Sequence, residues 1–190
     1  MTEGGFRRIR ERDVHQGYVW RVVTATFADP TGAEFERDIV RSPGAVGVVP
    51  LVFDAEGNPS VVLVRQYRPP YERELIEIPA GMRDVEGEPP EETARRELVE
   101  EAGLAPAALE RLVELYPSPG LTDSVTTVFL ATGCAPTERS LQGPEEEHSE
   151  LLHLPLDDAV RLVLSGDIND AKTVIGLLLT ERRLRTGDAG

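Results

Sequence analysis

Three glutamates near the middle of the chain are spaced so that together they could bind a cation. Glu97, Glu100 and Glu101 stand at i, i+3 and i+4, a spacing that places side chains on one face of a helix. Like charges at this spacing repel one another by roughly a few tenths of a kcal/mol per pair. The cluster is therefore typical either of a solvated helix face or of a site for a hard divalent cation such as Mg²⁺, which prefers oxygen ligands.

The residues around the glutamates predict a helix with defined ends. Pro89 or Pro90 suits the first turn of a helix, and Gly103 is a natural residue just beyond its end. Between them, the apolar positions recur at helical spacing and predict a buried stripe. That stripe consists of Ala94, Leu98 and Ala102.

The segment from Glu88 to Leu104 resembles the Nudix box. It reads Glu, seven residues, Arg-Glu, an apolar residue, any residue, Glu-Glu, any residue, Gly and an apolar residue. One position departs from the usual form, since six residues rather than five separate Gly81 from Glu88, which indicates a loop longer by one residue. The resemblance implies an α/β fold of α+β type: an α/β/α sandwich with a mixed sheet, in which the box forms loop, helix and loop.

Segments outside the box resemble the ADP-ribose pyrophosphatase branch of this family. They are 64–68 (Val-Arg-Gln-Tyr-Arg), 74–81 (Glu-Leu-Ile-Glu-Ile-Pro-Ala-Gly) and 116–120 (Tyr-Pro-Ser-Pro-Gly). Pro119 lies 15 residues after Leu104, where this branch carries a marker proline, whereas Ser124 stands where an acidic residue is frequent. The resemblance implies hydrolysis of ADP-ribose to AMP and ribose 5-phosphate.

The resemblance also implies a set of metal ligands and the catalytic residues near them. The cofactor would be Mg²⁺ or Mn²⁺, and Arg96 would orient the neighbouring carboxylates, with Glu88 as its partner. Glu100 would ligate the metal or hold a metal-bound water. The metal ligands expected are the carbonyl of Ala80 and the carboxylates of Glu97, Glu100, Glu101 and Glu147.

The general base is expected in the acidic loop at 144–150. Glu145 falls at the base position of the branch, and Glu147 at the position of a further metal ligand. His148 is an alternative base, because the unperturbed pKa of histidine is near 6.5. A merely solvated acidic loop is the other interpretation.

Substrate-binding residues are predicted on both sides of the box. Arg68 is the best candidate for a phosphate contact, because an arginine fork binds phosphate oxygens in pairs, and Gln66 would help to shape the site. Pro119 is the marker proline. Trp20, with Tyr18 beside it, would stack on adenine, or would instead lie in the core or at a dimer interface.

Composition excludes several classes of partner. The chain has 190 residues, 40% of them hydrophobic, and a formal net charge of −14, which disfavours nucleic acids and anionic membranes. No apolar run of about 18 residues and no apolar N-terminal segment are present, so we expect a cytoplasmic protein without a membrane span. Cys134 is the single cysteine; it cannot form an intrachain disulfide, and a catalytic thiol remains an alternative.

The hydrophobic pattern predicts an N-terminal hairpin or small sheet followed by a larger domain. Strands at 18–28 and 34–40 are expected within residues 1–41, as a dimerisation element of a homodimer. Residues 42–190 are expected to form the Nudix domain. Its predicted strands are 45–53, 61–67, 74–79, 109–116, 124–131 and 151–154; helices are predicted at 156–164 and from Asn169 or Asp170 to about 185, and 138–147 reads as a polar loop.

Other functions are compatible with the same residues. One is a Nudix hydrolase of another ADP-sugar, of GDP-mannose or of a dinucleotide. Another is a non-catalytic sensor that binds ADP-ribose, although such proteins usually lose the box carboxylates that this chain retains. A purely structural acidic domain is the third.

Overall fold

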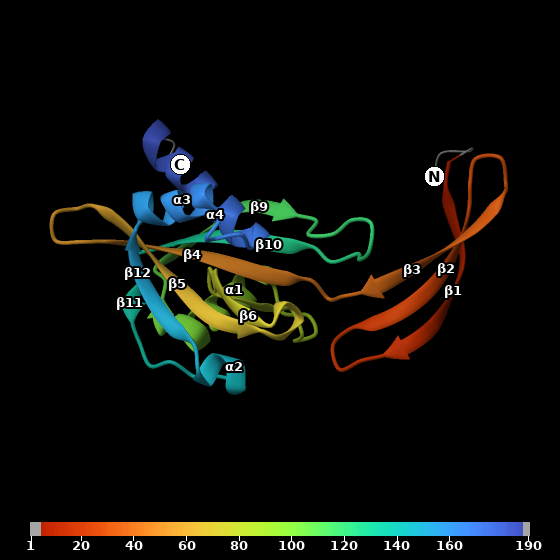
Figure 1. Ribbon diagram of the computed structural model, residues 1–190, viewed down its shortest axis with the longest axis horizontal. Helices are drawn as coiled ribbons and strands as arrows, with labels where there is room; N and C mark the ends of the chain where they lie inside the picture. Colours follow the sequence, from red (N-terminus) through yellow and green to blue (C-terminus); the bar gives the residue numbers. More distant parts are fainter. Residues whose placement is uncertain (1–4, 188–190) are drawn as a thin grey trace. The chain divides into compact units, whose positions relative to one another are not determined.

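The computed structural model describes residues 5–187. The chain divides into two compact units, each described by itself below (Figure 1). The first unit comprises Met1–Gly44 together with Tyr116–Val125, and the second comprises Ala45–Leu115 and Thr126–Gly190.

The first unit is built on a three-stranded antiparallel sheet. Its strands are β1 (Arg7–Gln16), β2 (Arg21–Ala28) and β3 (Glu34–Arg41), in the order β1-β2-β3. The predicted strands at 18–28 and 34–40 are confirmed as β2 and β3. The sequence analysis did not foresee β1, because its side chains are mostly charged and exposed; its backbone pairs with β2 through a ladder with two register shifts.

The segment Tyr116–Val125 is bonded to the end of β3 within the first unit. The amide of Val40 donates to the carbonyl of Leu121 over 2.9 Å, and the Thr122 hydroxyl donates to the Val40 carbonyl over 2.8 Å. Arg41 forms ion pairs with Glu11 of β1 and, at 3.0 Å, with Asp123 of this segment. Backbone and charge together therefore fix the segment against the small sheet.

The second unit contains a seven-stranded mixed sheet. Five strands follow the order β12-β5-β4-β10-β9, with β6 paired to β5 and β7 paired to β4; β4 and β10 run parallel and the other pairs antiparallel. A separate two-stranded antiparallel ladder is formed by β8 (Leu104–Ala105) and β11 (Ala135–Pro136). The strands are β4 (Ala45–Phe53), β5 (Pro59–Arg68), β6 (Arg73–Glu77), β7 (Ala80–Met82), β9 (Ala108–Leu115), β10 (Thr126–Thr132) and β12 (Glu150–Pro155).

Helices cover both faces of this sheet. On β4, Val46 and Val48 pack with Leu98 of α1 (Pro90–Ala102), whereas Val49 and Leu51 face the opposite cluster. That second cluster includes residues of α3 (Leu156–Ser165) and α4 (Ala171–Thr186). Alternate residues of a strand point to opposite faces, so a strand buried on both sides is apolar throughout. The predicted α/β/α sandwich is confirmed.

The ends of α1 follow the sequence signals. Pro89 occupies the N-cap and Pro90 the first helical position. Gly103 adopts φ 62°, the left-handed conformation that favours glycine, and its amide donates to the Val99 carbonyl over 3.0 Å. The predicted apolar stripe of Ala94, Leu98 and Ala102 is buried.

Two connecting segments complete the second unit. A short 3₁₀ turn, η1 (Pro69–Tyr71), follows β5, and a single helical turn, α2 (Pro144–Glu147), lies in the segment that the sequence predicted to be an irregular loop. Within residues 5–187, no helix has both the length and the apolar character needed to cross a bilayer.

Candidate active site

An acidic pocket of about 300 Å³ opens in the second unit. Residues from β5, β7, α1 and the α2 region surround it. Its lining comprises Gln66, Arg68, Pro69, Ala80, Gly81, Met82, Asp84, Arg96, Glu97, Glu100, Glu101, Gln142, Glu145 and Glu146. Eight of the predicted site residues are thus brought together: Gln66, Arg68, Ala80, Arg96, Glu97, Glu100, Glu101 and Glu145.

Two of the three spaced glutamates are buried, so the interpretation as a solvated helix face is wrong for them. Glu97 is 8% exposed and Glu101 is 4% exposed. Burial, with the negative charge of Glu100 nearby, raises the pKa of Glu97 to about 7. Burial likewise raises the pKa of Glu101 to about 8, although the Ala80 amide donates to its Oε2 over 2.8 Å. A cation beside these two carboxyl groups would stabilise their ionised forms and lower both pKa values.

Gly81 allows Glu97 to lie directly against the backbone of β7. A Cβ at position 81 would come within 2.0–2.2 Å of the Glu97 carboxyl group. The loop that follows is longer by one residue than in the usual box, and it contains a turn in which the Glu88 amide donates to the Val85 carbonyl over 3.2 Å, with Gly87 at φ 78°. Gly81 meanwhile pairs with Val46 in the sheet, so the longer loop leaves the approach of Gly81 to Glu97 intact.

Arg96 lies among the carboxylates of the box. Its Nη1 donates to Glu97 over 2.7 Å and to Glu100 over 3.1 Å, and its Nη2 donates to Glu88 over 3.3 Å. Burial alone would lower the pKa of Arg96, but the hydrogen bond with Glu88 and the charges of Glu97 and Glu100 raise it. The predicted pairing of Arg96 with Glu88 is therefore present, and it is extended to two glutamates of the cluster.

The donor set of the pocket fits a hard divalent cation. Carboxylates and a backbone carbonyl are the oxygen ligands that Mg²⁺ and Mn²⁺ accept. Among residues 5–187, however, no three acidic, histidine or cysteine side chains already surround a common point closely enough to hold an ion. Arg96 draws two carboxylates toward its guanidinium, and Ala80 holds Glu101. Binding an ion would therefore require these side chains to turn away from their present partners.

The α2 region brings Glu145 and Glu146 to the pocket. Glu147, the residue predicted as a further ligand, is exposed and is not among the lining residues. Glu146 stands there instead: its negative charge contributes to raising the pKa of both Glu97 and Glu101, and its Oε2 accepts a hydrogen bond from the Gln142 amide over 2.6 Å. Residue counting alone missed Glu146, because a helical turn rather than an extended loop sets which side chains face inward.

Arg68 and Gln66 of β5 also line the acidic pocket. Arg68 donates from Nε and Nη2 to the two carboxyl oxygens of Glu77, over 2.6 and 2.9 Å. Gln66 is 3% exposed, and its buried Nε2 donates to no protein acceptor within the described chain. An unpaired buried donor costs free energy, and Gln66 lines the pocket, so a turn of its amide toward the pocket would let a ligand accept from Nε2.

Comparison with known proteins decides the family. The NUDIX domain model matches residues 41–176. The chain belongs to the Nudix family.

Relatives and solved structures agree with this assignment. The chain is 37% identical over 171 residues to the ADP-ribose pyrophosphatase of Bacillus subtilis, covering 90% of each chain. It is 37% identical over 178 residues to that of Mycobacterium tuberculosis, covering 94% of this chain and 84% of the relative. A solved structure titled as an ADP compounds hydrolase superposes with a TM-score of 0.81 over 100% of both chains, at 24% identity, which supports the fold.

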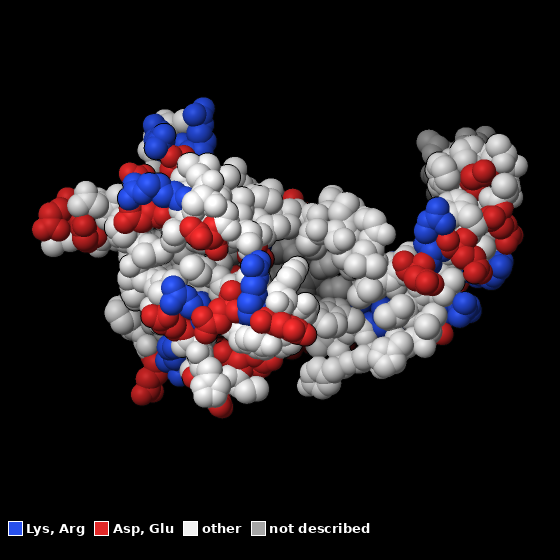
Figure 2. Space-filling view, viewed as in Figure 1, with Lys and Arg blue, Asp and Glu red and all other residues white. Residues whose placement is uncertain are grey.

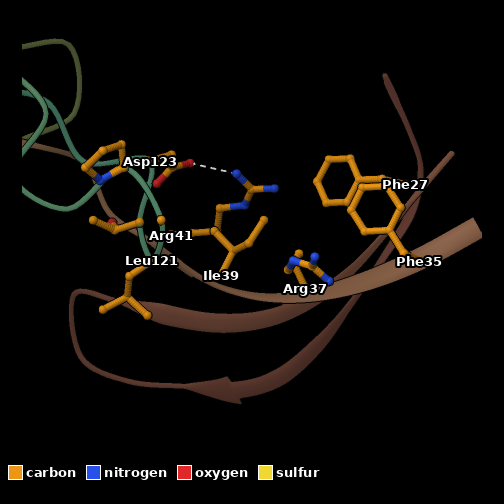
Figure 3. Close-up of a pocket in the computed structure, with 10 residues that line it drawn as sticks. Phe27, Phe35, Arg37, Ile39, Arg41, Leu121 and Asp123 are labelled. Carbon is orange, nitrogen blue, oxygen red and sulfur yellow. Dashed lines mark hydrogen bonds and ion pairs between the residues drawn. The ribbon is translucent and has the colours of Figure 1, made fainter. Parts of the chain in front are cut away.

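Pro119 and Trp20 of this Nudix protein lie in the first unit. Pro119 lines a second pocket, of about 370 Å³, which is formed within that unit by β2, β3 and the 119–123 segment. Figure 3 shows this aromatic pocket: the rings of Phe27 and Phe35 stack with centroids 5.7 Å apart, and Arg37 lies 4.9 Å from the Phe35 centroid. Neither Pro119 nor Trp20 lines the acidic pocket, so their contact with substrate stays a prediction.

The alternative that Trp20 and Tyr18 are core residues is wrong for the chain by itself. Trp20 is 54% exposed and Tyr18 is fully exposed. An adenine contact and a dimer interface remain the two interpretations for them.

Cys134 does not have the character of a catalytic thiol. Its side chain is half-buried against the apolar cluster beneath α1, and burial raises the pKa of the thiol. A raised pKa lowers the thiolate fraction at neutral pH, and the thiolate is the nucleophile. We therefore assign Cys134 to packing.

Proposed function

We propose that this Nudix protein is a divalent-metal-dependent pyrophosphohydrolase that cleaves ADP-ribose to AMP and ribose 5-phosphate. The observation that carries the proposal is the acidic pocket: two buried carboxyl groups with raised pKa values, a third beside them and a partly buried arginine among them. The names of the relatives add the substrate, since both relatives described above are ADP-ribose pyrophosphatases.

In this proposal the carboxylates of the box and one backbone carbonyl hold the metal. When bound, Mg²⁺ or Mn²⁺ would neutralise phosphate oxygens and lower the pKa of a bound water. Arg96 keeps the carboxylates in place through its contacts with Glu88, Glu97 and Glu100. The proposed ligands are the carbonyl of Ala80 and the carboxylates of Glu97, Glu100 and Glu101, with Glu147 retained as a predicted ligand from outside the pocket lining.

Glu145 is the proposed general base. It lines the acidic pocket together with the glutamates of the box helix, and its carboxylate would accept a proton from the attacking water. The variant Glu145→Gln should lower kcat by about 10²-fold. An unchanged kcat would transfer the role to Glu146, which lines the same pocket.

Arg68 and Gln66 are the proposed phosphate contacts. The net charge of the chain is −14, and Figure 2 shows acidic side chains interspersed with basic ones on the visible face. An anionic substrate therefore needs a local reversal of the field, and a guanidinium beside a bound cation supplies one. The unpaired Nε2 of Gln66 adds a neutral donor for a phosphate oxygen.

Recognition of the adenosine end is assigned to Trp20 and Pro119 in this proposal. Trp20, which is exposed, would stack on adenine, and Pro119 would border the substrate. We propose a homodimer in which the N-terminal strands of residues 1–41 form the dimerisation element, and a cytoplasmic enzyme. Light scattering on the purified protein tests the dimer directly: a monomeric mass would contradict it.

Another nucleotide sugar or a dinucleotide is the second candidate substrate, because the acidic pocket acts on the diphosphate and not on the groups attached to it. A substrate panel with product masses separates the candidates. We expect ADP-ribose to have the highest kcat/KM, with AMP and ribose 5-phosphate as products, and we expect EDTA to abolish turnover and Mg²⁺ to restore it. Binding of ADP-ribose without any metal-dependent turnover would instead indicate a sensor.

A further inference from the structure

We infer that Glu77 is a positioning residue, which holds the guanidinium of Arg68 in the orientation that receives the diphosphate of the substrate. Lys172 assists by supplying a second cation to the same carboxylate. The inference rests on the proposed function, because it assigns a role within the same acidic pocket. It concerns a residue that precedes the box and a residue of the last helix, neither of which lines that pocket.

The geometry between Glu77 and Arg68 is that of a fixed fork. Glu77 is 2% exposed, and its two oxygens accept from Nε and Nη2 of Arg68 over 2.6 and 2.9 Å. Two parallel hydrogen bonds of this kind set the plane of a guanidinium as well as its position. The donors of Arg68 that remain are available to phosphate oxygens, because its side chain is 35% exposed and lines the acidic pocket.

The charges around Glu77 leave Arg68 attractive to an anion. If Arg68 were its single partner, the Glu77 carboxylate would cancel the charge of the arginine. Lys172 also contacts this carboxylate through Nζ. The negative charge of Glu77 is shared between two cations, and Asp170 pairs with Lys172 over 3.0 Å, so the four charges sum to zero. Arg68 therefore attracts a phosphate through the N–H donors that Glu77 leaves unused, rather than through a net positive charge.

The two segments that carry this network are joined by buried hydrogen bonds. The Ile78 amide donates to the Thr173 hydroxyl over 2.9 Å, and that hydroxyl donates to Asp170 over 2.6 Å. Thr173 is fully buried. Ile78, which directly follows the last residue of β6, is thus bonded to the start of α4. The carboxylate that orients Arg68 is therefore itself held in place.

The consequence for function is preorganisation. A free arginine side chain loses rotamer freedom when it binds an anion, and that loss weakens binding. An arginine that is already ordered by Glu77 has lost this freedom on folding. Removal of the Glu77 charge should therefore act on substrate affinity through Arg68, and it should have little further effect once Arg68 itself has been changed.

A double-mutant cycle on ADP-ribose hydrolysis at saturating Mg²⁺ tests this dependence. The variants are Glu77→Gln, Arg68→Lys and the double variant, with Glu77→Asp as a partial rescue. We expect Glu77→Gln to raise KM about 10-fold with a smaller change in kcat, and the double variant to lie within about twofold of Arg68→Lys. The matched control is Glu150→Gln, which breaks the exposed pair between Glu150 of β12 and Arg65 of β5, the strand that also carries Arg68; it should leave KM unchanged.

Independent effects would overturn the inference. If the losses of Glu77→Gln and Arg68→Lys multiply in the double variant, or if Glu77→Gln leaves KM unchanged, Glu77 serves the fold alone. If the wild-type protein does not hydrolyse ADP-ribose, the proposed function fails, and the same cycle is measured as calorimetric affinity for inorganic pyrophosphate with Mg²⁺. Additive losses there, or no binding by the wild type, would overturn the inference on its own terms.

Discussion

Two groups of buried glutamates in the second unit have opposite electrostatic properties. Glu77 is 2% exposed and contacts two cations, Arg68 and Lys172. Burial alone would raise its pKa, but the hydrogen bond from Arg68 and the charge of Lys172 lower it to about 2. Glu97 and Glu101 are buried to a similar degree, yet their pKa values are raised to about 7 and about 8.

The difference between the two groups lies in their counter-charges rather than in their burial. Arg96 is shared among the carboxylates of the box. Among residues 5–187, Glu101 is stabilised in its ionised form by the Ala80 amide and by the charge of Arg68, and it has no ion pair of its own. A buried acid that is paired with cationic side chains of the protein has a structural role. A group of buried acids with too few cationic partners is suited to bind a metal cation. The comparison separates a structural carboxylate from binding carboxylates within one small domain.

Loss of one binding carboxylate should have the largest effect on activity. Glu101→Gln should lower kcat by about 10²-fold or more, because it removes a proposed metal ligand. Steady-state kinetics with ADP-ribose and Mg²⁺ measure this effect. Glu92→Gln is the matched control, since Glu92 is exposed in the first turn of the same helix, and its kcat should match the wild type. A near-wild-type rate for Glu101→Gln would contradict the assignment.

Loss of Glu77 should lower the stability of the fold in addition to its effect on KM. Glu77→Gln should lower the free energy of unfolding by about 2 kcal/mol at pH 7, because two partly buried cations, Arg68 and Lys172, lose the buried carboxylate that they contact. The pKa of Glu77 is lowered on folding, so its contribution is complete above the unfolded value near 4.5 and is lost as the pH falls toward about 2. Urea titrations of both proteins should therefore differ at pH 7 and converge below pH 4.5. A constant difference down to pH 2.5 would refute this account of Glu77.

The binding carboxylates should show the opposite pH dependence in the metal-free protein. Their pKa values are raised on folding, so between pH 4.5 and about 8 the folded state binds more protons than the unfolded state, and stability falls as the pH rises. We expect the free energy of unfolding of the EDTA-treated protein to fall by on the order of 5 kcal/mol from pH 5 to pH 8, which lowers the Tm by roughly 10–20 °C. In the variant Glu97→Gln/Glu101→Gln the slope should be smaller. Equal slopes for wild type and variant would show that the surface charge alone is responsible.

The sequence was sufficient to predict the elements whose signals are local. The helix of the box begins at Pro90 and ends before Gly103 because a proline and a left-handed glycine set its ends, and its apolar stripe is buried as helical spacing requires. The strands β4, β5 and β10 contain apolar runs between turn residues and were predicted for the same reason, whereas the short β7 was not predicted. In contrast, β1 has no apolar alternation, so only its pairing with β2 makes it a strand.

The parts of the site that depend on contacts distant in sequence were not predictable. Glu77 and Lys172 are 95 residues apart, and no local pattern indicates that the last helix starts beside the strand before the box. The choice between Glu146 and Glu147 depends on one turn of helix, α2. The burial of Glu97 and Glu101 follows from the packing of α1 on the sheet, which i, i+3 and i+4 spacing alone leaves open.

Calorimetric titration of the metal-free protein with Mn²⁺ or Mg²⁺ at pH 7.5 tests the central claim most directly. The wild type should bind the ion and release protons as it does so, since two carboxyl groups with raised pKa values must ionise. Glu97→Gln/Glu101→Gln should lose the binding, whereas Glu92→Gln should retain it. Binding of equal affinity in the double variant, or no binding by the wild type even with ADP-ribose present, would contradict the claim that these buried glutamates are a metal site.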